Sequence, residues 1–230
     1  MIKDNIKNVR ARMKAACDRC GRDISEVTLI NVSKTKPIPD LMEAYNAGER
    51  IFGENKVQEI NDKLPQMPED VRWHMIGHLQ RNKVKYIVDK VELIHSVDSL
   101  RLAEAISEEA VKKKCQVDIL VEVNVAEEES KFGSTVSDTL SLVKEIALLP
   151  NIHIKGLMTI APYVEVPEEN RTIFRALKKL SVDIEKQNID NICMGVLSMG
   201  MTGDFEVAIE EGATMIRVGT AIFGARDYSI

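Results

Sequence analysis

Short β-type segments alternate with amphipathic helical segments along almost the whole sequence. Eight β-type segments can be read, at residues 27–33, 50–52, 72–76, 93–97, 117–124, 153–159, 193–198 and 215–218. Helical patterns separate them, at residues 38–47, 55–63, 80–89, 99–114, 136–148, 168–188 and 204–211. This alternation is typical of parallel strands joined by helical crossovers. Several strands are apolar on both faces, as in a sheet that is covered on both sides.

The number of strand–helix units predicts the fold class. Eight units favour an α/β fold that is a single (β/α)8 TIM-like barrel, preceded by an extra N-terminal helix that ends at Gly21. A doubly wound open sheet is the alternative that the pattern leaves open. No low-complexity segment, charge block or Pro/Ser-rich linker divides the chain. We therefore expect one domain over residues 1–230.

Composition and charge exclude several classes of function. The net charge is −5 and 44% of the residues are hydrophobic, so no basic surplus points to nucleic acid or to an anionic membrane. No apolar run approaches the ~20 residues of a membrane span, and the N-terminal segment lacks the apolar core of a signal peptide. Four cysteines in 230 residues do not look like a disulfide framework. We expect a cytoplasmic protein that binds neither nucleic acid nor membrane.

One pair of cysteines and one pair of histidines raise the possibility of a metal site. Cys17 and Cys20 form a lone CxxC at the end of a helical pattern, without the second pair or the nearby histidines that a structural zinc site needs. His74 and His78 are separated by Gly77 and a strand pattern, so they do not share one helical face. We expect no metal ligands here.

Polar residues and glycines gather where the predicted strands end. In a barrel of this type the C-terminal ends of the strands carry the functional residues. The loops after the seventh and eighth strands are a frequent phosphate site in this architecture, although small residues there can also serve tight turns. The candidate site residues at this rim are Lys34, Asn55, Ser198, Met199, Gly200, Arg217, Gly219 and Thr220.

Lys34 follows the apolar run VTLINV, in the stretch VSKTKP. An amine that faces a phosphate site across the rim suits a Schiff base with a phosphorylated aldehyde, because partial desolvation lowers a lysine pKa and frees the amine for attack. A solvated lysine, or a point charge that attracts phosphate, is the equally weighted alternative. Arg217 lies inside another apolar run and needs a partner, either a structural carboxylate or a ligand atom.

Several of these stretches resemble one known family nearly end to end. The motifs VSKTKP, FGENKVQE, WHMIGHLQRNKVKYI, IHSVDS, VEVNVAEEESKFG, IKGLMTIAP and LSMGMTGDFEVAIEEGATMIRVGTAIFG resemble the pyridoxal 5′-phosphate (PLP) homeostasis proteins, small relatives of the alanine racemase barrel. The resemblance implies that Lys34 is the Schiff-base lysine and that Arg217 faces the pyridine nitrogen. It implies phosphate contacts from Ser198, Gly219 and Thr220, assisted by the backbone of Met199 and Gly200, with Asn55 beside the cofactor.

The resemblance also implies a function without substrate turnover. It points to a PLP carrier in intracellular homeostasis, with PLP-dependent apo-enzymes as recipients, and we expect a monomer. Racemase relatives add an all-β domain and a tyrosine base, whereas only Ala221–Ile230 follow Thr220, so we expect no second domain. A PLP-dependent amino-acid racemase is the alternative, and it would need Tyr163 or His78 as a second base. Lys131 is a second lysine expected at the same rim.

Overall fold

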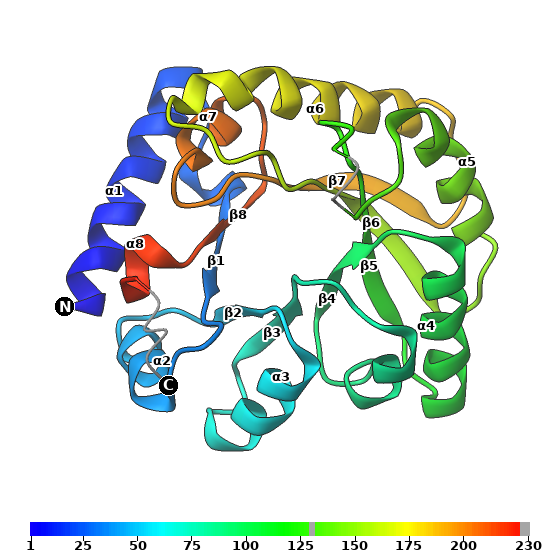
Figure 1. The fold of residues 1–230 in the computed structure, drawn as a ribbon, viewed down its shortest axis with the longest axis horizontal. Helices are drawn as coiled ribbons and strands as arrows, with labels where there is room; N and C mark the ends of the chain where they lie inside the picture. The colour runs from blue at the N-terminus through cyan, green and yellow to red at the C-terminus, as the bar shows by residue number, and fades with distance from the viewer. Residues whose placement is uncertain (129–131, 226–230) are drawn as a thin grey trace.

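The strands close into a barrel, as the alternating pattern predicts. A computed structural model describes residues 1–128 and 132–225. All eight strands are parallel and pair in chain order, and the last pairs with the first, which confirms the TIM-like barrel (Figure 1). The strands are β1 (Thr28–Val32), β2 (Ile51–Glu54), β3 (Arg72–Met75), β4 (Leu93–Val97), β5 (Val117–Glu122), β6 (Ile152–Met158), β7 (Ile192–Ser198) and β8 (Met215–Val218).

Helices surround the barrel and cover the outer face of the strands (Figure 1). They are α1 (Ile2–Cys20), α2 (Ile38–Asn46), α3 (Val57–Lys63), α4 (Leu100–Lys113), α5 (Val136–Ile146), α6 (Arg171–Glu185), α7 (Phe205–Glu210) and α8 (Thr220–Phe223). The short 3-10 helices are η1 (Ile24–Glu26), η2 (Leu64–Gln66), η3 (Arg81–Tyr86) and η4 (Pro167–Asn170).

The sequence pattern predicts a helix at residues 80–89, but no α-helix forms there. The segment forms only η3, in which the Ile87 N–H donates to the Val84 carbonyl three residues earlier. Its apolar residues Val84, Ile87 and Val88 are buried. Spacings of three and four residues suit a short tight helix as well as an α-helix, so the pattern alone does not separate the two.

Helix α1 covers the barrel beside β8 and β1, where the helix that follows β8 is short. Its residues Ile2, Ile6, Val9 and Met13 recur at helical spacing and are all buried. The helix packs against α7 and α8, next to the seam between β8 and β1 (Figure 1). Since α8 spans only four residues, α1 covers apolar surface that a full eighth helix would cover in a regular barrel.

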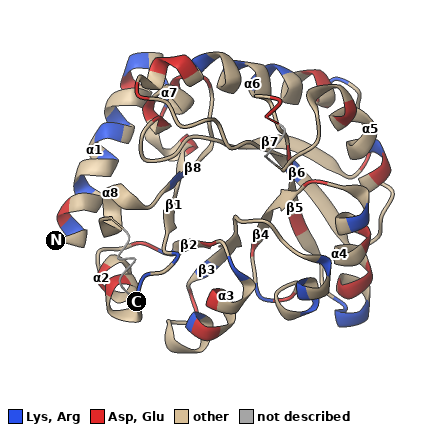
Figure 2. Ribbon diagram, viewed as in Figure 1, with Lys and Arg blue, Asp and Glu red and all other residues tan. Residues whose placement is uncertain are grey.

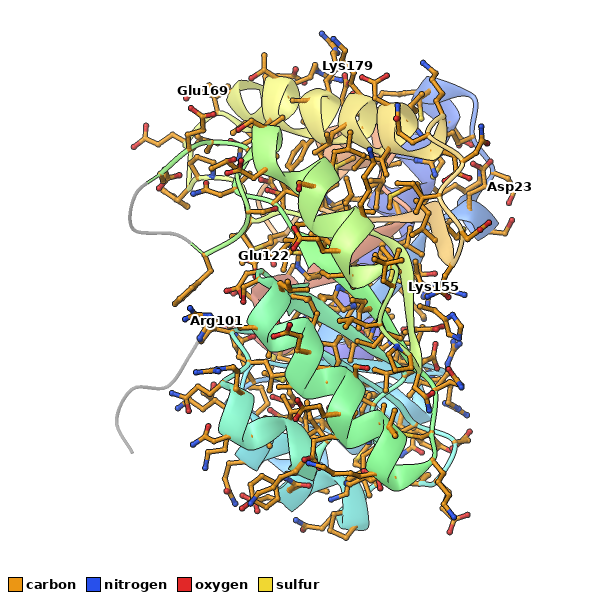
Figure 3. All side chains as sticks on the ribbon, turned by 90° about the vertical axis from the view of Figure 1, so that its right-hand side faces the viewer. Asp23, Arg101, Glu122, Lys155, Glu169 and Lys179 are labelled. Carbon is orange, nitrogen blue, oxygen red and sulfur yellow. The ribbon has the colours of Figure 1, made fainter. Side chains whose placement is uncertain are left out.

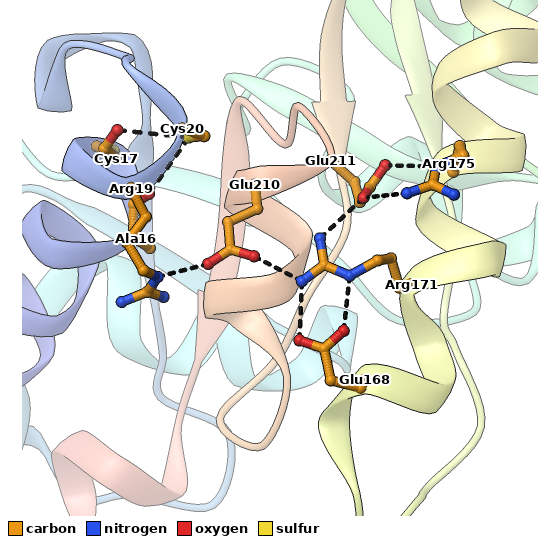
Figure 4. A network of polar contacts seen from close by, with 9 residues as sticks. All are labelled: Ala16, Cys17, Arg19, Cys20, Glu168, Arg171, Arg175, Glu210 and Glu211. Atoms are coloured by element: carbon orange, nitrogen blue, oxygen red, sulfur yellow. Dashed lines mark hydrogen bonds and ion pairs between the residues drawn. The ribbon is translucent and has the colours of Figure 1, made fainter.

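An ion-pair network joins α1, α6 and α7 on the outer surface (Figure 4). Arg171 donates to Glu168 at 2.7 and 2.8 Å, to Glu210 at 2.6 Å and to Glu211 at 2.8 Å. Arg19 of α1 reaches the same Glu210 at 2.7 Å. These carboxylates raise the pKa of Arg171. The fork geometry of arginine allows several such contacts at once, and Glu210, which accepts from both Arg171 and Arg19, links α7 to α6 and to α1.

Elsewhere the outer helices carry both signs of charge interspersed (Figure 2). Within the described residues no helix is both long and apolar enough to cross a membrane. In the same part of the chain no cluster of three or more His, Cys, Asp or Glu side chains has the arrangement of a metal site. Cys20 Sγ instead donates to the Ala16 carbonyl at 3.2 Å, one helical turn back in α1.

The inside of the barrel carries both apolar and polar side chains. Leu93, Leu120 and Met158, on β4, β5 and β6, form a small apolar cluster of their own. Two residues further along several strands, inward positions carry polar side chains: His95 follows Leu93, Glu122 follows Leu120 and Arg217 follows Met215. Because side chains alternate across a strand with period two, each pair shares the inward face. These polar side chains therefore point into the barrel near the C-terminal ends of their strands.

Candidate functional site

A cavity of about 540 Å³ opens at the C-terminal ends of the strands. Five of the predicted site residues line it: Lys34, Asn55, Arg217, Gly219 and Thr220. They come from three separate parts of the chain, after β1, after β2, and on and after β8. The barrel brings them together because parallel strands place all their C-terminal ends at one rim.

Apolar side chains form much of the remaining wall. Val32, Ile76, Ile160 and Met201 line the cavity between the polar groups. Wide apolar faces interrupted by a few convergent polar groups are typical of cofactor and small-molecule sites. The cavity thus offers contact for a flat ring and charge for an anionic end.

Charged side chains form hydrogen bonds with the backbone on both sides of Lys34. Lys63 Nζ donates to the Ser33 carbonyl at 2.9 Å, and Glu59 Oε2 accepts from the Thr35 N–H at 2.7 Å. Thr35 has a φ of 64°, a left-handed conformation that is rare for a β-branched residue. Such a residue persists only where its surroundings over-determine it. The Lys63 and Glu59 contacts supply that constraint on the segment that presents Lys34.

Glu54 contacts both Ser33, which precedes Lys34, and Lys63. Its side chain is fully buried at the end of β2 and accepts from Ser33 Oγ at 2.6 Å and from Lys63 Nζ at 2.8 Å. Burial raises the pKa of Glu54 to about 7, although Lys63 and Ser33 act in the opposite direction. The second carboxylate oxygen, Oε2, is buried without a hydrogen-bond partner among the described residues. An unpaired buried oxygen favours the protonated form in the same way.

Arg217 reaches the cavity from inside the barrel. Its Nη1 donates to Ser198 Oγ, and its Nη2 donates to the Thr159 carbonyl at 2.8 Å. The partners are neutral oxygens, not the structural carboxylate that the sequence allowed. Burial lowers the pKa of Arg217 to about 10, with Glu122 and Asp204 raising it again, so the side chain stays charged at neutral pH. A buried positive charge with neutral partners favours an anion or an electron-rich atom on the cavity side.

Ser198, Met199 and Gly200 lie behind the cavity wall. All three are buried, and none lines the cavity. The Ser198 hydroxyl contacts Arg217 on one side and His95 Nδ1, at 2.9 Å, on the other. The Met199 N–H donates to the Met215 carbonyl at 3.1 Å. The structure therefore separates these residues from the five that face the cavity.

The turn between β7 and α7 forms another part of the wall. Asp204 is buried and accepts from the Met201 N–H at 2.7 Å and from Asn170 Nδ2 at 2.8 Å. Asn170 also donates to the Pro162 carbonyl at 2.9 Å. Asp204 thus joins the loop after β6 to the loop after β7, and both loops border the cavity.

Asn55 is positioned by a close backbone contact. A Cβ atom on Gly77 would lie 2.5 Å from the Asn55 carbonyl oxygen, so only glycine allows the turn after β3 to approach this closely. The turn after β2 is thereby held against its neighbour, which sets the edge of the cavity at Asn55.

The sequence did not predict four buried polar residues of the barrel as part of the site: Glu54, His74, His95 and Glu122. Glu122 lies at the rim end of β5, at the same end of the molecule as Arg101 and opposite to Lys155 (Figure 3). Burial raises its pKa to about 7, with the negative charge of Asp98 acting in the same direction and Arg217 acting against it. A charged residue inside an apolar strand run was the signal available for Glu122, as it was for Arg217.

The two candidate second bases occupy different places. Tyr163 lines the cavity, but 93% of its surface is exposed. His78 lies outside this cavity, with its ring stacked on Phe132 at 3.9 Å and its Nδ1 3.6 Å from Asp98 Oδ2. Lys131 lies outside the described residues.

The residues on the cavity wall fit PLP by their chemistry. An amine at Lys34 suits the aldehyde, and the donor-only guanidinium of Arg217 suits a ring nitrogen. Gly219 and Thr220 stand at the start of α8, where the backbone can approach a phosphate. The apolar side chains between them suit the two faces of the ring.

Comparison with known proteins places the chain in a family. The family model described as "Alanine racemase, N-terminal domain" matches residues 2–227. The protein of Aquifex aeolicus named pyridoxal phosphate homeostasis protein is 44% identical over 226 residues, which cover 98% of each chain.

Solved structures show the same fold. PipY of Synechococcus elongatus, in a structure with PLP bound, has a TM-score of 0.84 at 33% identity, covering 97% of this chain and 100% of that one. Alanine racemase of Corynebacterium glutamicum has a TM-score of 0.71 at 15% identity, covering 99% of this chain but 63% of that one. At that identity the likeness concerns the fold alone.

Proposed function

This chain belongs to the family of pyridoxal phosphate homeostasis proteins, which have the barrel of the alanine racemase N-terminal domain, and we propose that it binds PLP as a Schiff base on Lys34. In this role it holds the cofactor for other proteins in the cytoplasm and does not turn over a substrate. The whole of residues 1–230 acts as one PLP-binding domain, as a monomer, and PLP-dependent apo-enzymes receive the cofactor.

One observation carries the proposal: Lys34, Arg217 and the Gly219–Thr220 turn line a single cavity of about 540 Å³. Lys34 would supply the amine that condenses with the aldehyde of PLP, with loss of one water. Gly219 and Thr220 would hold the phosphate, with Ser198 and the backbone of Met199 and Gly200 behind them, and Asn55 would border the ring.

The arrangement of charges supports carriage over catalysis. PLP supplies an electron sink when its ring nitrogen is protonated, and enzymes that need the full sink usually place a carboxylate there. Arg217 only donates, and with a pKa of about 10 it stays charged. It therefore favours an unprotonated nitrogen. This lowers the capacity for carbanion chemistry while still orienting the ring.

The residues around the cavity also support a carrier over a racemase. Racemisation by two bases needs a positioned acid–base group on each face of the reacting carbon. Tyr163 is the tyrosine that lines the cavity within the described chain, and its side chain is almost fully in water. A group held this loosely does not supply a positioned base. An open site also admits water and incoming amines, which suits release of a cofactor.

The test begins with PLP bound to the purified protein. The adduct is reduced with borohydride, in which hydride adds to the imine carbon and the nitrogen takes a proton, and the labelled peptide is mapped. We expect the label on Lys34, its loss in Lys34→Ala, and no change in Lys155→Ala at the opposite end of the barrel. A label chiefly on Lys131 or on another lysine would overturn the assignment.

Transfer and turnover separate a carrier from a racemase. The loaded protein is mixed with an apo-enzyme that requires PLP, and in parallel with each enantiomer of alanine followed by chiral chromatography. We expect slow activation of the apo-enzyme and unchanged alanine. Racemisation at about 1 per second or faster, within the ordinary enzyme range, would contradict the carrier role.

A further inference from the structure

A second groove lies beside the cavity of Lys34, between α3 and η3. It has a volume of about 560 Å³, and Asn55 lines both this groove and the cavity. Lys56, in the turn before α3, and Lys83, in η3, also line it. We call it the α3–η3 groove. Because the two hollows share Asn55, a small molecule in the groove is next to the cavity.

The α3–η3 groove is rich in hydrogen-bond donors and poor in negative charge. Among the described residues that line it there is no Asp or Glu, whereas Lys56, Lys83 and the Asn55 amide can all donate to an anion. The centre of the Tyr86 ring, in the same wall, lies 5.9 Å from Lys83 Nζ and 5.0 Å from Lys85 Nζ. Lys85 therefore adds a third positive charge beside the groove.

The two lysines that line the groove are not neutralised by carboxylates. Within the described part of the chain neither Lys56 nor Lys83 forms an ion pair, whereas Arg19 and Arg175 on the outer helices contact carboxylates at 2.7 and 2.9 Å. The whole chain has a net charge of −5, which repels an anion on average. The positive charge of the groove reverses that sign next to the cavity.

The order of the strands relates the groove to the proposed phosphate turn. Lys34 follows β1, and β1 pairs with β2 on one side and with β8 on the other. Asn55 follows β2, whereas Gly219 and Thr220 follow β8. An anion that moves from the groove to the Gly219–Thr220 turn therefore passes Lys34.

We propose that the α3–η3 groove is an anion-binding approach to the cavity, which receives the phosphate of incoming PLP before the aldehyde reaches Lys34. A phosphate monoester carries a charge of about −1.5 to −2 at pH 7. Charges of one sign that line a cleft raise the local concentration of an oppositely charged ligand and its rate of association. The role in PLP entry rests on the proposed function, whereas binding of a phosphate anion by the groove does not.

The approach role is tested by the rate at which PLP adds to the protein without cofactor. Stopped-flow absorbance at low PLP concentration gives a second-order rate constant. We expect Lys56→Gln/Lys83→Gln to lower it about three- to tenfold at about 20 mM NaCl. The difference should shrink toward about 300 mM NaCl, because salt screens exposed charges. Lys56→Arg/Lys83→Arg keeps both charges and should keep the wild-type rate.

Pyridoxal, which has the same aldehyde but no phosphate, is the matched control ligand. It should react equally fast with the wild type and with Lys56→Gln/Lys83→Gln. Lys178→Gln/Lys179→Gln removes two exposed charges from α6, across the barrel from α3 (Figure 1), and should match the wild type with both ligands. Equal PLP rates in the wild type and the groove variant, or equal slowing with pyridoxal, would overturn the approach role.

Anion binding by the groove is tested separately with inorganic phosphate and no cofactor. The 15N-labelled protein is titrated with phosphate, and with NaCl at equal ionic strength, and followed by 1H–15N NMR. We expect saturable shifts of the Gln80 side-chain amide and the Lys83 backbone amide, which Lys56→Gln/Lys83→Gln abolishes. Shifts confined to Gly219 and Thr220 would overturn anion binding by the groove. Shifts at the groove in a protein that does not react with PLP would support the groove and refute the proposed function.

Discussion

Arg217 on β8 and Ser198 on β7 meet inside the barrel, where Arg217 Nη1 donates to Ser198 Oγ. The contact joins a buried charge to a buried neutral hydroxyl and leaves the charge facing the cavity. It also links the cavity to two histidines inside the barrel. Several expected outcomes depend on this contact and on the comparable support around Lys34.

Ser198→Ala removes the partner of both Arg217 and His95. Each is then left with a buried polar atom that lacks a partner, so we expect the free energy of unfolding to fall by about 1–3 kcal/mol. The PLP dissociation constant should rise about tenfold. Denaturant titration and PLP titration measure the two effects, with the exposed Ser141→Ala as a control. Weaker PLP binding at full stability would indicate direct contact between the hydroxyl and the phosphate instead.

Lys63→Met removes the cation that holds Glu54 and the Ser33 carbonyl. Breaking a buried pair leaves an uncompensated charge, and we expect a loss of about 3 kcal/mol in the free energy of unfolding at pH 8. The loss should shrink as the pH falls, because Glu54 then takes up a proton. Adding Glu54→Gln to Lys63→Met should restore much of the stability at pH 8. The exposed Lys56→Met serves as the control, and an equal loss at pH 5 and pH 8 would contradict the pairing.

Glu122→Gln should change the pH dependence of stability. Burial raises the pKa of Glu122 from 4.5 to about 7, so the folded chain keeps a proton that the unfolded chain releases. This contribution is fully present below pH 4.5 and is lost as the pH rises through about 7. Glutamine cannot ionise, so the variant should gain stability over the wild type at pH 8, by at most about 3 kcal/mol.

The measurement for Glu122→Gln is urea unfolding at a series of pH values between 4 and 8.5. Glu104→Gln, an exposed position on α4, controls for the loss of one negative charge. If the two variants follow the same curve, Glu122 titrates as an ordinary surface carboxyl.

Gly156→Ala tests a close backbone contact between β6 and β7. Gly156 of β6 has a φ of 154°, and a Cβ atom there would lie 1.8 Å from the Val196 carbonyl oxygen on β7. The strands would have to separate, so we expect a loss of at least about 3 kcal/mol in stability, or failure to fold. Gly195→Ala is the matched control, since its Cβ would meet only Cys193 Sγ at 3.2 Å. Equal melting temperatures for the two variants would contradict the close approach.

Much of the barrel could be predicted from local pattern. The eight strands of the predicted set all form, because alternation of β-type and helical segments reports which faces are buried. The rim residues Lys34, Asn55, Arg217, Gly219 and Thr220 could be placed together for the same reason, since parallel strands end at one edge. The segment after β3 differs because spacings of three and four residues suit a 3-10 turn as well as an α-helix.

The sequence by itself determined the order of strands and helices and the rim residues that meet at the cavity, because these follow from the period of apolar residues and from strand direction. Only the tertiary structure decided that Ser198 faces His95 and Arg217 inside the barrel, and that Lys63 and Glu59 fix the backbone beside Lys34. Those contacts join residues 103 and 30 positions apart, across strands and between a helix and a loop. Closure of the barrel sets their distances, and no local pattern records which buried polar group will complete the hydrogen bonds of another.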